Sequence, residues 1–538
     1  MNLVQESTAV SLRQAFERNV SACADKDAIL EEVAKISWRD LAAVVSAIEN
    51  CLRTAGLGGA MVGLMMPGSI AYVASVLAVT GVRGVFAPMD ETWPDNRIKA
   101  TLRLARPPAL IVTSSQVARA RALLTASEVS CLLLVLDPEN LLAGPQVERE
   151  QVWAPGAPPV INAPDQPWQA DSLYLVFTSG STGTPNAVEG CHGSLAQFIQ
   201  WQQQTYGVTG SCRVAQLAPT TFDVSLRDIF LPLSAGGTMC IPRAGTKYHP
   251  VLLCKWIEKF QVNLMHSVPS LFKFVVDMTQ GQPKLARAFD SLEKLFLSGE
   301  RLYVADAMTI YTRLSQEAEV INFYGPSEST LIKSHFVLPR AMAADCPQVA
   351  PLGRAIAGAS LHVRSEGQEC APGVNGEIVL RSPYLAKGYF GNPALTDSKF
   401  AVLDATQTPA LREYRTGDLG YMDQDGLLHF VGRMDDQIKL NGNRIEIGDV
   451  EQCIRKMPQI KDAVVAACTL PSGELQLGCV YISGEPSLDE DQIHSYMSQN
   501  LPAYMVFSRM VAVEEFPLMA NGKVDRQRIR DLLLSIAQ

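Results

Sequence analysis

The amino-acid sequence predicts an α/β protein with more than one lobe, and three observations lead to this prediction. The chain has 538 residues, which is too long for a single hydrophobic core. Before Pro351, short continuous apolar runs typical of buried strands alternate with helical segments, which indicates parallel sheet. After Pro351, short alternating segments separated by Gly, Asn and Asp indicate antiparallel sheet instead.

The first part of the chain predicts helices and buried strands in turn. Leu12, Phe16 and Val20 share one helical face, so the first helix is expected to be amphipathic. Further helices are expected over 36–52, 70–79 and 116–124. Continuous apolar runs predict strands at 85–89, 109–113, 131–136, 240–242, 262–265 and 294–298, and the Pro-, Ala- and Asp-rich stretch 154–169 predicts a loop. Two similar α/β halves are compatible with this order.

The last part of the chain predicts a change of architecture. Alternating patterns favour strands at 361–364, 376–380 and 427–431. The polar segment 432–436 is expected to be a loop and a domain hinge. Beyond it, a helix at 447–456, strands at 463–468 and 476–483, and a helix at 490–500 predict a small α+β lobe.

Composition excludes several classes of function. The net charge of −9 argues against a nucleic-acid or anionic-membrane surface, although an acidic surface can still surround a cationic phosphate site. The N-terminus lacks the basic and apolar regions of a signal peptide. The most apolar window, 70–85, contains Thr80, Gly81 and Arg83 and falls short of a membrane span. We therefore expect a cytoplasmic protein without nucleic-acid or membrane partners.

The cysteines indicate neither a zinc site nor a disulfide framework. Twelve cysteines are scattered along the chain without a Cys-x-x-Cys pair. Cys131, Cys254 and Cys479 lie in apolar runs, so we expect them to be small core residues in a reducing compartment.

One stretch carries the strongest chemical signal. An apolar run of strand character at 175–177 leads into a loop made almost entirely of Gly, Ser and Thr, and this loop ends at Pro185. Successive backbone N–H groups and hydroxyls in such a loop can converge on phosphate oxygens, and glycine lets the main chain approach the anion. No Gly-Lys-Ser/Thr follows, so this is not a Walker A loop. The alternative is a flexible surface linker. The residues expected to bind phosphate are Thr178, Ser179, Gly180, Ser181, Thr182, Gly183 and Thr184.

Further motifs follow this loop in a fixed order. They are Phe222-Asp223-Val224-Ser225, Asn322-Phe323-Tyr324-Gly325-Pro326-Ser327-Glu328, Tyr414-Arg415-Thr416-Gly417-Asp418, Gly432-Arg433-Met434-Asp435, Gly442-Asn443-Arg444 and Asn521-Gly522-Lys523. Together with the loop, this series resembles the adenylation domains of non-ribosomal peptide synthetases. These domains belong to the adenylate-forming superfamily, which also holds acyl-CoA ligases and luciferases. The resemblance covers nearly the whole chain.

The resemblance implies a fold and a two-step reaction. The fold is a large N-terminal domain (1–434) of two α/β subdomains plus a small β-barrel-like region, followed by a small mobile α+β C-terminal domain (435–538). In the first step a carboxylate attacks the α-phosphorus of ATP with Mg²⁺, which gives an acyl-adenylate and pyrophosphate. In the second, a phosphopantetheine thiol takes the acyl group as a thioester, and the small domain rotates between the steps.

The expected partner is a carrier protein. The sequence contains no segment with a serine for phosphopantetheine, so the carrier is expected to act in trans. A free-standing enzyme and an excised domain both fit this sequence. A small MbtH-like helper protein is a further partner that the sequence leaves open.

The resemblance assigns catalytic roles to individual residues. Lys523 would reach the substrate carboxylate and the α-phosphate, and Glu328 would hold Mg²⁺. Asp435 corresponds to the hinge, and Gly442 lines the path of the pantetheine arm. The structural alternatives are a solvated lysine and a surface carboxylate.

The resemblance also assigns a nucleotide site. Asp418 would accept hydrogen bonds from the ribose with Arg433 beside it, although the two could also be a simple ion pair. Tyr324 and Phe430 would sandwich adenine, with an aromatic core position as the alternative for Phe430. The remaining residues expected at this site are Gly299, Glu300, Arg301, Asn322, Phe323, Gly325 and Ser327.

One position departs from the family pattern. Members usually carry Lys-Gly after the proline of the loop, where this chain has Asn186-Ala187. A lysine there would contact the β- and γ-phosphates or pyrophosphate. We interpret the chain as an active enzyme with altered kinetics, and an inactive nucleotide-binding or carrier-docking module is the alternative.

Asp223 favours an amino acid as the substrate. A buried carboxylate at this position would pair with the substrate ammonium, whereas a buried carboxylate without a partner would be costly. The alternative role is a helix N-cap, since a helical pattern starts at Ser225. Asp223 opposes the rival function of an acyl-CoA-type ligase.

The side-chain pocket favours an acidic amino acid. Arg227 and His266 are set among apolar residues, where a cation needs a partner, and a substrate carboxylate would supply one. This pair resembles domains that activate glutamate or methylaspartate, so we expect an Asp- or Glu-like substrate, including β-substituted forms. The alternative is that Arg227 turns outward and His266 is a core histidine, with a small polar amino acid such as serine as the substrate. The residues aligned with the substrate pocket are Asp223, Val224, Arg227, His266, Phe296, Ser298, Phe323, Leu331, Ile332 and Lys523.

Overall fold

The computed structural model describes residues 11–144, 146–152, 171–178, 185–285, 287–341, 347–434, 437–440, 442–470, 475–484, 488–507, 509–518 and 524–535. The chain forms two compact units. The first contains 1–91, 106–176 and 187–434, and the second contains 92–105, 177–186 and 435–538. The second unit thus includes two segments that the linear division into 1–434 and 435–538 places in the large domain.

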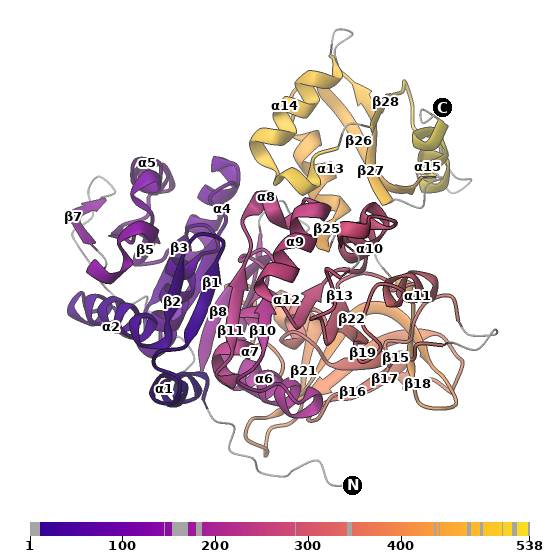
Figure 1. The fold of residues 1–538 in the computed structure, drawn as a ribbon. Helices are drawn as coiled ribbons and strands as arrows, with labels where there is room; N and C mark the ends of the chain where they lie inside the picture. Colours follow the sequence, from indigo (N-terminus) through magenta and orange to yellow (C-terminus); the bar gives the residue numbers. More distant parts are fainter. Residues whose placement is uncertain are drawn as a thin grey trace. The chain divides into compact units, whose positions relative to one another are not determined.

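The first unit contains a nine-stranded sheet (Figure 1). Six of the predicted site residues lie in its strands: His266, Phe296, Ser298, Asn322, Phe323 and Tyr324. The inner strand pairs of this sheet are parallel, and antiparallel strands are added at both edges. In spatial order the strands are β16 (Arg354–Ala355), β15 (Ser334–Leu338), β14 (Glu319–Tyr324), β13 (Lys294–Ser298), β12 (Leu264–Ser267), β10 (Arg213–Ala215), β11 (Thr238–Ile241), β1 (Asp27–Glu31) and β2 (Lys35–Ser37).

The first unit also contains an eight-stranded sheet, and its five central strands are parallel. Its spatial order is β20 (Gly388–Tyr389), β9 (Asn186–Cys191), β8 (Ser172–Thr178), β4 (Val85–Met89), β3 (Met61–Met65), β5 (Ala109–Val112), β6 (Cys131–Val135) and β7 (Gln146–Val152). The continuous apolar runs therefore form buried strands, as the sequence predicted, because parallel strands covered on both faces need no polar alternation.

Helices of the first unit lie between most of these strands, as expected for parallel sheet. They are α1 (Leu12–Ala22), α2 (Trp38–Thr54), α3 (Ile70–Gly81), α5 (Val117–Ser127), α6 (His192–Tyr206), α7 (Ser225–Ala235), α8 (Ala244–Lys247), α9 (Pro250–Phe260), α10 (Pro269–Thr279), α11 (Val304–Tyr311) and α12 (Pro393–Lys399). Short 3₁₀ turns are η1 (Ser114–Gln116), η2 (Pro138–Ala143), η3 (Pro283–Leu285), η4 (Ser327–Ser329) and η5 (Ala503–Met505).

The start of the second helix was predicted too early. Ile36 and Ser37 belong to β2, and the Ser37 hydroxyl accepts a hydrogen bond from the Asp40 N–H at the first turn of α2. Serine favours the cap over the helix interior because its side chain satisfies a free backbone donor there.

Cys131, Cys254 and Cys479 are buried, as predicted, and every cysteine that the structure describes has a free thiol. Within the described residues, no helix has the length and apolar character needed to cross a bilayer.

An antiparallel sheet forms the predicted β region. Its order is β18 (Gln368–Glu369), β17 (Ser360–Ser365), β19 (Gly376–Ser382), β22 (Leu411–Met422) and β21 (Phe400–Asp404), and β23 (Leu428–Arg433) also pairs with β22. Gly432 and Arg433 belong to β23, so the expected loop at 432–436 was wrong for these two residues: Gly432 pairs with Leu419 and Arg433 with Asp418.

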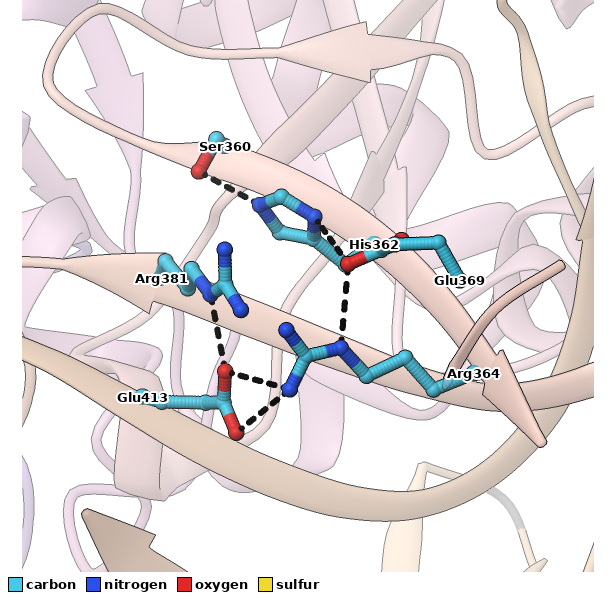
Figure 2. A network of polar contacts seen from close by, with 6 residues as sticks. All are labelled: Ser360, His362, Arg364, Glu369, Arg381 and Glu413. Atoms are coloured by element: carbon cyan, nitrogen blue, oxygen red, sulfur yellow. Dashed lines mark hydrogen bonds and ion pairs between the residues drawn. The ribbon is translucent and has the colours of Figure 1, made fainter. Parts of the chain in front are cut away.

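A polar network joins the strands of this sheet (Figure 2). Arg364 donates from Nη1 to both carboxylate oxygens of Glu413, at 3.1 and 3.0 Å, and Arg381 donates from Nε at 2.7 Å. Arg364 also donates to Glu369, which contacts the His362 ring at 2.9 Å. Glu413 is 8% exposed, so one carboxylate links three strands where water competes little.

We expect Glu413→Gln to lower the free energy of unfolding by about 1–2 kcal/mol, because two charge-assisted contacts lose their acceptor charge. Chemical denaturation of the full chain measures this. The matched variant Asp290→Asn removes an exposed ion pair with Arg287 and should leave the denaturation midpoint unchanged. Equal effects of the two variants would contradict a structural role for the network.

The second unit contains the small α+β lobe. The four predicted elements are present as α13 (Ile447–Arg455), β26 (Ile460–Thr469), β27 (Leu475–Ser483) and α14 (Glu490–Asn500) (Figure 1). The sequence interpretation missed β28 (Arg509–Ala512), which pairs in parallel with β27, and α15 (Arg526–Ser535). The unit also contains α4 (Asp95–Ala105) and the hairpin of β24 (Gln437–Leu440) and β25 (Asn443–Glu446).

Candidate active site

Three neighbouring parallel strands bring predicted substrate residues together. His266 in β12 pairs with Phe296 in β13, and Ser298 in β13 pairs with Phe323 in β14. The Phe296 and Phe323 rings are 4.7 Å apart. Because side chains alternate along a strand, Phe296 and Ser298 share one face of the sheet, whereas Leu295 and Leu297 pack into a separate core cluster.

Asp223 lies in the turn before α7 and is 5% exposed. Its backbone carbonyl accepts a hydrogen bond from the Leu226 N–H at 2.9 Å, but the N-cap of α7 is Val224, which makes no side-chain cap. The N-cap alternative for Asp223 is therefore wrong. Burial raises the pKa of its carboxyl, and this rise is opposed by a hydrogen bond with Ser327 and by the Arg227 charge.

Arg227 points inward from α7 and is 2% exposed. Its Nη2 donates to the Ser298 hydroxyl at 3.0 Å. Its Nε and Nη1 are buried without a hydrogen-bond partner among the described residues, although the carboxylates of Asp228 and Asp223 are near enough to raise its pKa against the lowering effect of burial. The outward-turning alternative is wrong, and two donor nitrogens of a buried cation face no acceptor.

His266 has a partner at each ring nitrogen. Nδ1 is 2.8 Å from Asp228 Oδ1, and Nε2 is 2.8 Å from the Gln202 side-chain nitrogen. Burial, followed by the Arg227 charge, lowers the pKa of His266 to about 4, so the ring is neutral. It donates from Nδ1, accepts at Nε2 and stacks on Phe296 at 5.0 Å. His266 thus matches the alternative of a satisfied core histidine, and Arg227 is the cation of this pair.

The sequence interpretation missed Asp228 and Gln202, which hold His266 in place. Asp228 is fully buried in α7, and Gln202 is fully buried in α6. Two charged residues, Arg227 and Asp228, interrupt the otherwise apolar stretch Leu226–Leu233, and this was the available signal for Asp228. Gln202 gave no comparable signal.

Leu331 and Ile332 lie in a turn between η4 and β15 and are almost fully buried against the cluster that contains Phe296 and Phe323. Thr330 and Leu331 adopt left-handed backbone angles, with φ of 58° and 64°. Gly325 packs directly against this turn: a Cβ at Gly325 would come within 2.0 Å of the Leu331 carbonyl oxygen. The motif glycine is therefore required by close backbone approach. Val224 is partly buried against the same cluster.

The predicted nucleotide residues form a second group. Tyr324 donates from its hydroxyl to Asp418 Oδ2 at 2.6 Å, and Arg433 Nη1 donates to Asp418 Oδ1 at 2.7 Å. Asp418 is 5% exposed. The Asp–Arg ion pair is thus present, and each carboxylate oxygen retains a further lone pair that can accept from another hydroxyl.

Other residues predicted for this site surround that group. The Arg301 guanidinium lies over the Phe430 ring at 5.1 Å, and Arg301 also donates to the Val431 carbonyl at 3.1 Å. Tyr324 and Phe430 pack in one core cluster. Asn322 donates to the Pro351 carbonyl at 2.8 Å, Gly299 has a φ of 92°, and Glu300 accepts from the Ser270 N–H. Asn322 and Glu300 therefore have structural partners of their own.

Glu328 is fully buried beside these residues. The Tyr389 hydroxyl donates to its Oε1 at 2.7 Å, and Glu328 lies close enough to Asp223 to raise the pKa of that carboxyl. No cluster of three His, Cys, Asp or Glu side chains suited to a metal occurs among the residues described. A single hard carboxylate fits Mg²⁺, which keeps several waters and takes its other ligands from substrate phosphates.

Several predicted residues lie outside the described residues. These are Lys523, Asp435 and the loop residues Ser179, Gly180, Ser181, Thr182, Gly183 and Thr184. Thr178 ends β8 and Asn186 begins β9, so a strand borders the loop on each side. Gly442 lies in the turn between β24 and β25 with a φ of 77°, which suits glycine.

Comparison with protein families gives two matches. The family described as AMP-binding enzyme matches residues 16–390, and the family described as AMP-binding enzyme C-terminal domain matches residues 449–523. Tyrocidine synthase 3 of Brevibacillus parabrevis is 29% identical over 98% of this chain, and a dimodular nonribosomal peptide synthase of Bacillus subtilis (strain 168) is 30% identical over 97%. The chain spans only 8% and 21% of the length of these relatives.

Solved structures give the same fold. The chain superposes with a TM-score of 0.77 on holo-PA1221, a protein containing adenylation and PCP domains, with 25% identity, 98% coverage of this chain and 85% of the other. The Vibrio cholerae adenylation domain AlmE, solved with glycyl-adenosine-5'-phosphate, gives a TM-score of 0.81 at 21% identity, with 99% and 100% coverage. From its sequence matches and its fold, this chain belongs to the AMP-binding enzyme family of adenylate-forming ligases and is similar to the adenylation domains of non-ribosomal peptide synthetases.

Proposed function

We propose that the protein activates an acidic amino acid as its aminoacyl-adenylate and transfers it to the phosphopantetheine thiol of a carrier protein. Enzymes of this family use ATP with Mg²⁺. The observation that carries the proposal is the pair of oppositely charged, buried side chains on α7 and the turn before it. Asp223 lacks an ion pair with a cation in the described part of the chain, and Arg227 has two unpartnered donor nitrogens.

An amino acid with a side-chain carboxylate provides a partner for both residues. Its α-ammonium pairs with Asp223, and its side-chain carboxylate accepts from one of the two unpartnered Arg227 nitrogens, Nε or Nη1. Leaving these donors unpaired costs about 1–3 kcal/mol for each buried group, so a ligand that pairs one of them is favoured over one that does not. The Ser298 hydroxyl, already bonded to Arg227, fixes the guanidinium plane.

The residues near the substrate carboxylate support the first chemical step. The carboxylate oxygen forms a bond to the α-phosphorus of ATP while the bond to pyrophosphate breaks, and the two reacting groups are both anionic. Glu328 would hold the Mg²⁺ that offsets this charge, and Tyr389 orients Glu328 through their hydrogen bond. By resemblance, Lys523 supplies a further positive charge.

The nature of the acceptor and the location are part of the same proposal. The domain composition of holo-PA1221, with an adenylation and a PCP domain, supports a carrier protein as acceptor. The carrier is proposed to act in trans, and an MbtH-like helper protein is a further partner to be tested by co-expression. The free thiols of the described cysteines support a cytoplasmic location.

Amino-acid-dependent exchange of pyrophosphate into ATP tests the proposal. Purified protein is assayed with aspartate, glutamate, β-methylaspartate, serine and a panel of neutral amino acids. Exchange that depends on an acidic amino acid supports the proposal, and preference for serine supports the alternative substrate. Absence of exchange with every amino acid supports the inactive module suggested by Asn186. Thioester formation on coenzyme A rather than on a carrier would indicate an acyl-CoA-type ligase.

We expect Tyr324→Phe to raise the KM for ATP about five- to tenfold, because Asp418 loses a buried hydrogen bond worth about 1–1.5 kcal/mol and is held less firmly toward the ribose. The KM for the amino acid should not change. Steady-state exchange kinetics with each substrate varied in turn measure both constants. An unchanged KM for ATP would remove Asp418 from the proposed nucleotide site.

A further inference from the structure

A buried lysine lies directly behind the turn that carries Leu331 and Ile332. Lys333 is 0% exposed, although a lysine ammonium is rarely buried without a carboxylate. Its Nζ donates to the backbone carbonyls of Thr330 at 3.3 Å and Ile332 at 3.4 Å. The described residues give it no ion pair, and its titratable neighbour is Cys191 in β9.

Burial of the Lys333 ammonium lowers the free energy of unfolding. Removing an ammonium from water is unfavourable, and two long contacts to neutral carbonyls compensate little of this cost. A methionine of similar length would fill the same space without this cost. A residue that lowers stability and lies beside a binding site is a candidate for a functional role.

The contacts of Lys333 define what it can hold. The turn Thr330–Ile332 contains two non-glycine residues in left-handed conformations, which are strained for residues that carry a Cβ. The Lys333 ammonium bonds the first and last carbonyls of this turn, and the Ser329 hydroxyl bonds the middle one, that of Leu331, at 3.1 Å. The backbone at both ends is fixed as well, since the Lys333 N–H donates to the Tyr324 carbonyl and Gly325 packs on the turn.

We propose that Lys333 is a positioning residue whose buried amino group, which has N–H donors for both carbonyls in its charged and its neutral form, holds the turn Thr330–Ile332 in its strained conformation. It thereby sets where Leu331 and Ile332 meet the substrate side chain. This inference rests on the proposed function, because it assigns the turn to the substrate pocket. It adds a selectivity determinant that does not itself touch the substrate.

The protonation of Lys333 gives the proposal a pH signature. Burial lowers the pKa of Lys333 from 10.5 to about 7, and its titratable neighbour Cys191 has a raised pKa and is neutral, as is Tyr174 beside Thr330 and Cys191. Between about pH 7 and pH 10.5, Lys333 is protonated in the unfolded chain but neutral in the folded chain. Stability linked to Lys333 therefore rises with pH over this window, and the cost of burying the charge is fully present below pH 7.

Thermal unfolding of Lys333→Met tests the cost of the buried ammonium. We expect a higher Tm than that of the wild type, with a gain that is larger at pH 6.5 than at pH 9. The matched control Lys255→Met removes an exposed lysine from α9 and should not change Tm at either pH. A lower Tm for Lys333→Met would overturn the proposal, because it would make Lys333 a net stabilising residue.

Exchange kinetics test the positioning role. We expect Lys333→Met to raise the KM for the preferred amino acid about tenfold, equal to about 1.4 kcal/mol, with the KM for ATP unchanged. Selectivity between aspartate and glutamate should relax, and Lys333→Gln, which retains side-chain N–H donors, should recover part of it. If the wild-type enzyme is active and Lys333→Met has the same KM for the amino acid and the same selectivity, this inference alone is overturned. A wild-type chain without amino-acid-dependent exchange would instead overturn the proposed function.

Discussion

Replacement of Asp223 by alanine is expected to lower kcat/KM for the amino acid by about 10²–10³ or more, since removing one member of a buried charge pair costs about 3–5 kcal/mol. The α-ammonium of the substrate would then enter a buried region without its counter-ion, while Arg227 keeps its positive charge nearby. The KM for ATP should change little. Pyrophosphate exchange at saturating ATP, with the amino acid varied, measures the loss.

The stability of the same variant separates a binding role from a structural one. Burial raises the pKa of Asp223, which means that its charge is costly in the absence of substrate. Asp223→Ala should therefore be no less stable than the wild type. Asp397→Ala, an exposed carboxylate in α12, serves as the control and should retain full activity. A strong loss of stability with proportionate loss of activity would contradict the assignment of Asp223 to the substrate ammonium.

Replacement of Arg227 by methionine is expected to remove the preference for an acidic side chain. The substrate carboxylate would lose a buried guanidinium, so we expect kcat/KM for the acidic amino acid to fall about 100-fold or more. Activity with neutral amino acids of similar size should rise relative to the acid, because the side-chain site no longer contains an unpaired cation. Exchange rates with aspartate, glutamate and serine measure this change.

Two controls make the Arg227 result specific. Arg18→Met removes an exposed arginine from α1 and should leave the amino-acid preference unchanged. Thermal unfolding of Arg227→Met should show a Tm equal to or above that of the wild type, because the buried guanidinium has two unpartnered nitrogens. An unchanged order of amino-acid preference would contradict the acidic-substrate proposal, whatever the total activity.

Much of the fold was predictable because its strands are buried on both faces. The runs that became β4, β5 and β6 are apolar throughout, so the pattern could be recognised without knowledge of neighbouring strands. The elements that were missed or misplaced depend on tertiary context. β28 pairs with β27 over only four positions, and Gly432–Arg433 extend β23 because β22 offers a partner strand.

The site was predictable only to the level of residue type and order. The motif order located Asp223, Arg227 and Asp418, and the structure places each of them in a buried polar setting. The tautomer and orientation of the His266 ring depend on Asp228 and Gln202, which are 38 and 64 residues away in the sequence. No local pattern identifies such partners. The burial of Lys333 follows from the packing of the turn against Gly325 and from the nearby Cys191 in β9, and the sequence alone would predict an exposed lysine at this position.

In the proposed amino-acid-activating enzyme, the buried cation Arg227 selects a substrate carboxylate. Wild-type exchange rates with two isosteric pairs, aspartate against asparagine and glutamate against glutamine, test this selection. We expect kcat/KM for at least one acid to exceed that of its amide by about 100-fold or more, corresponding to about 3 kcal/mol. Equal rates for acid and amide in both pairs, or a preference for the amide, would contradict it.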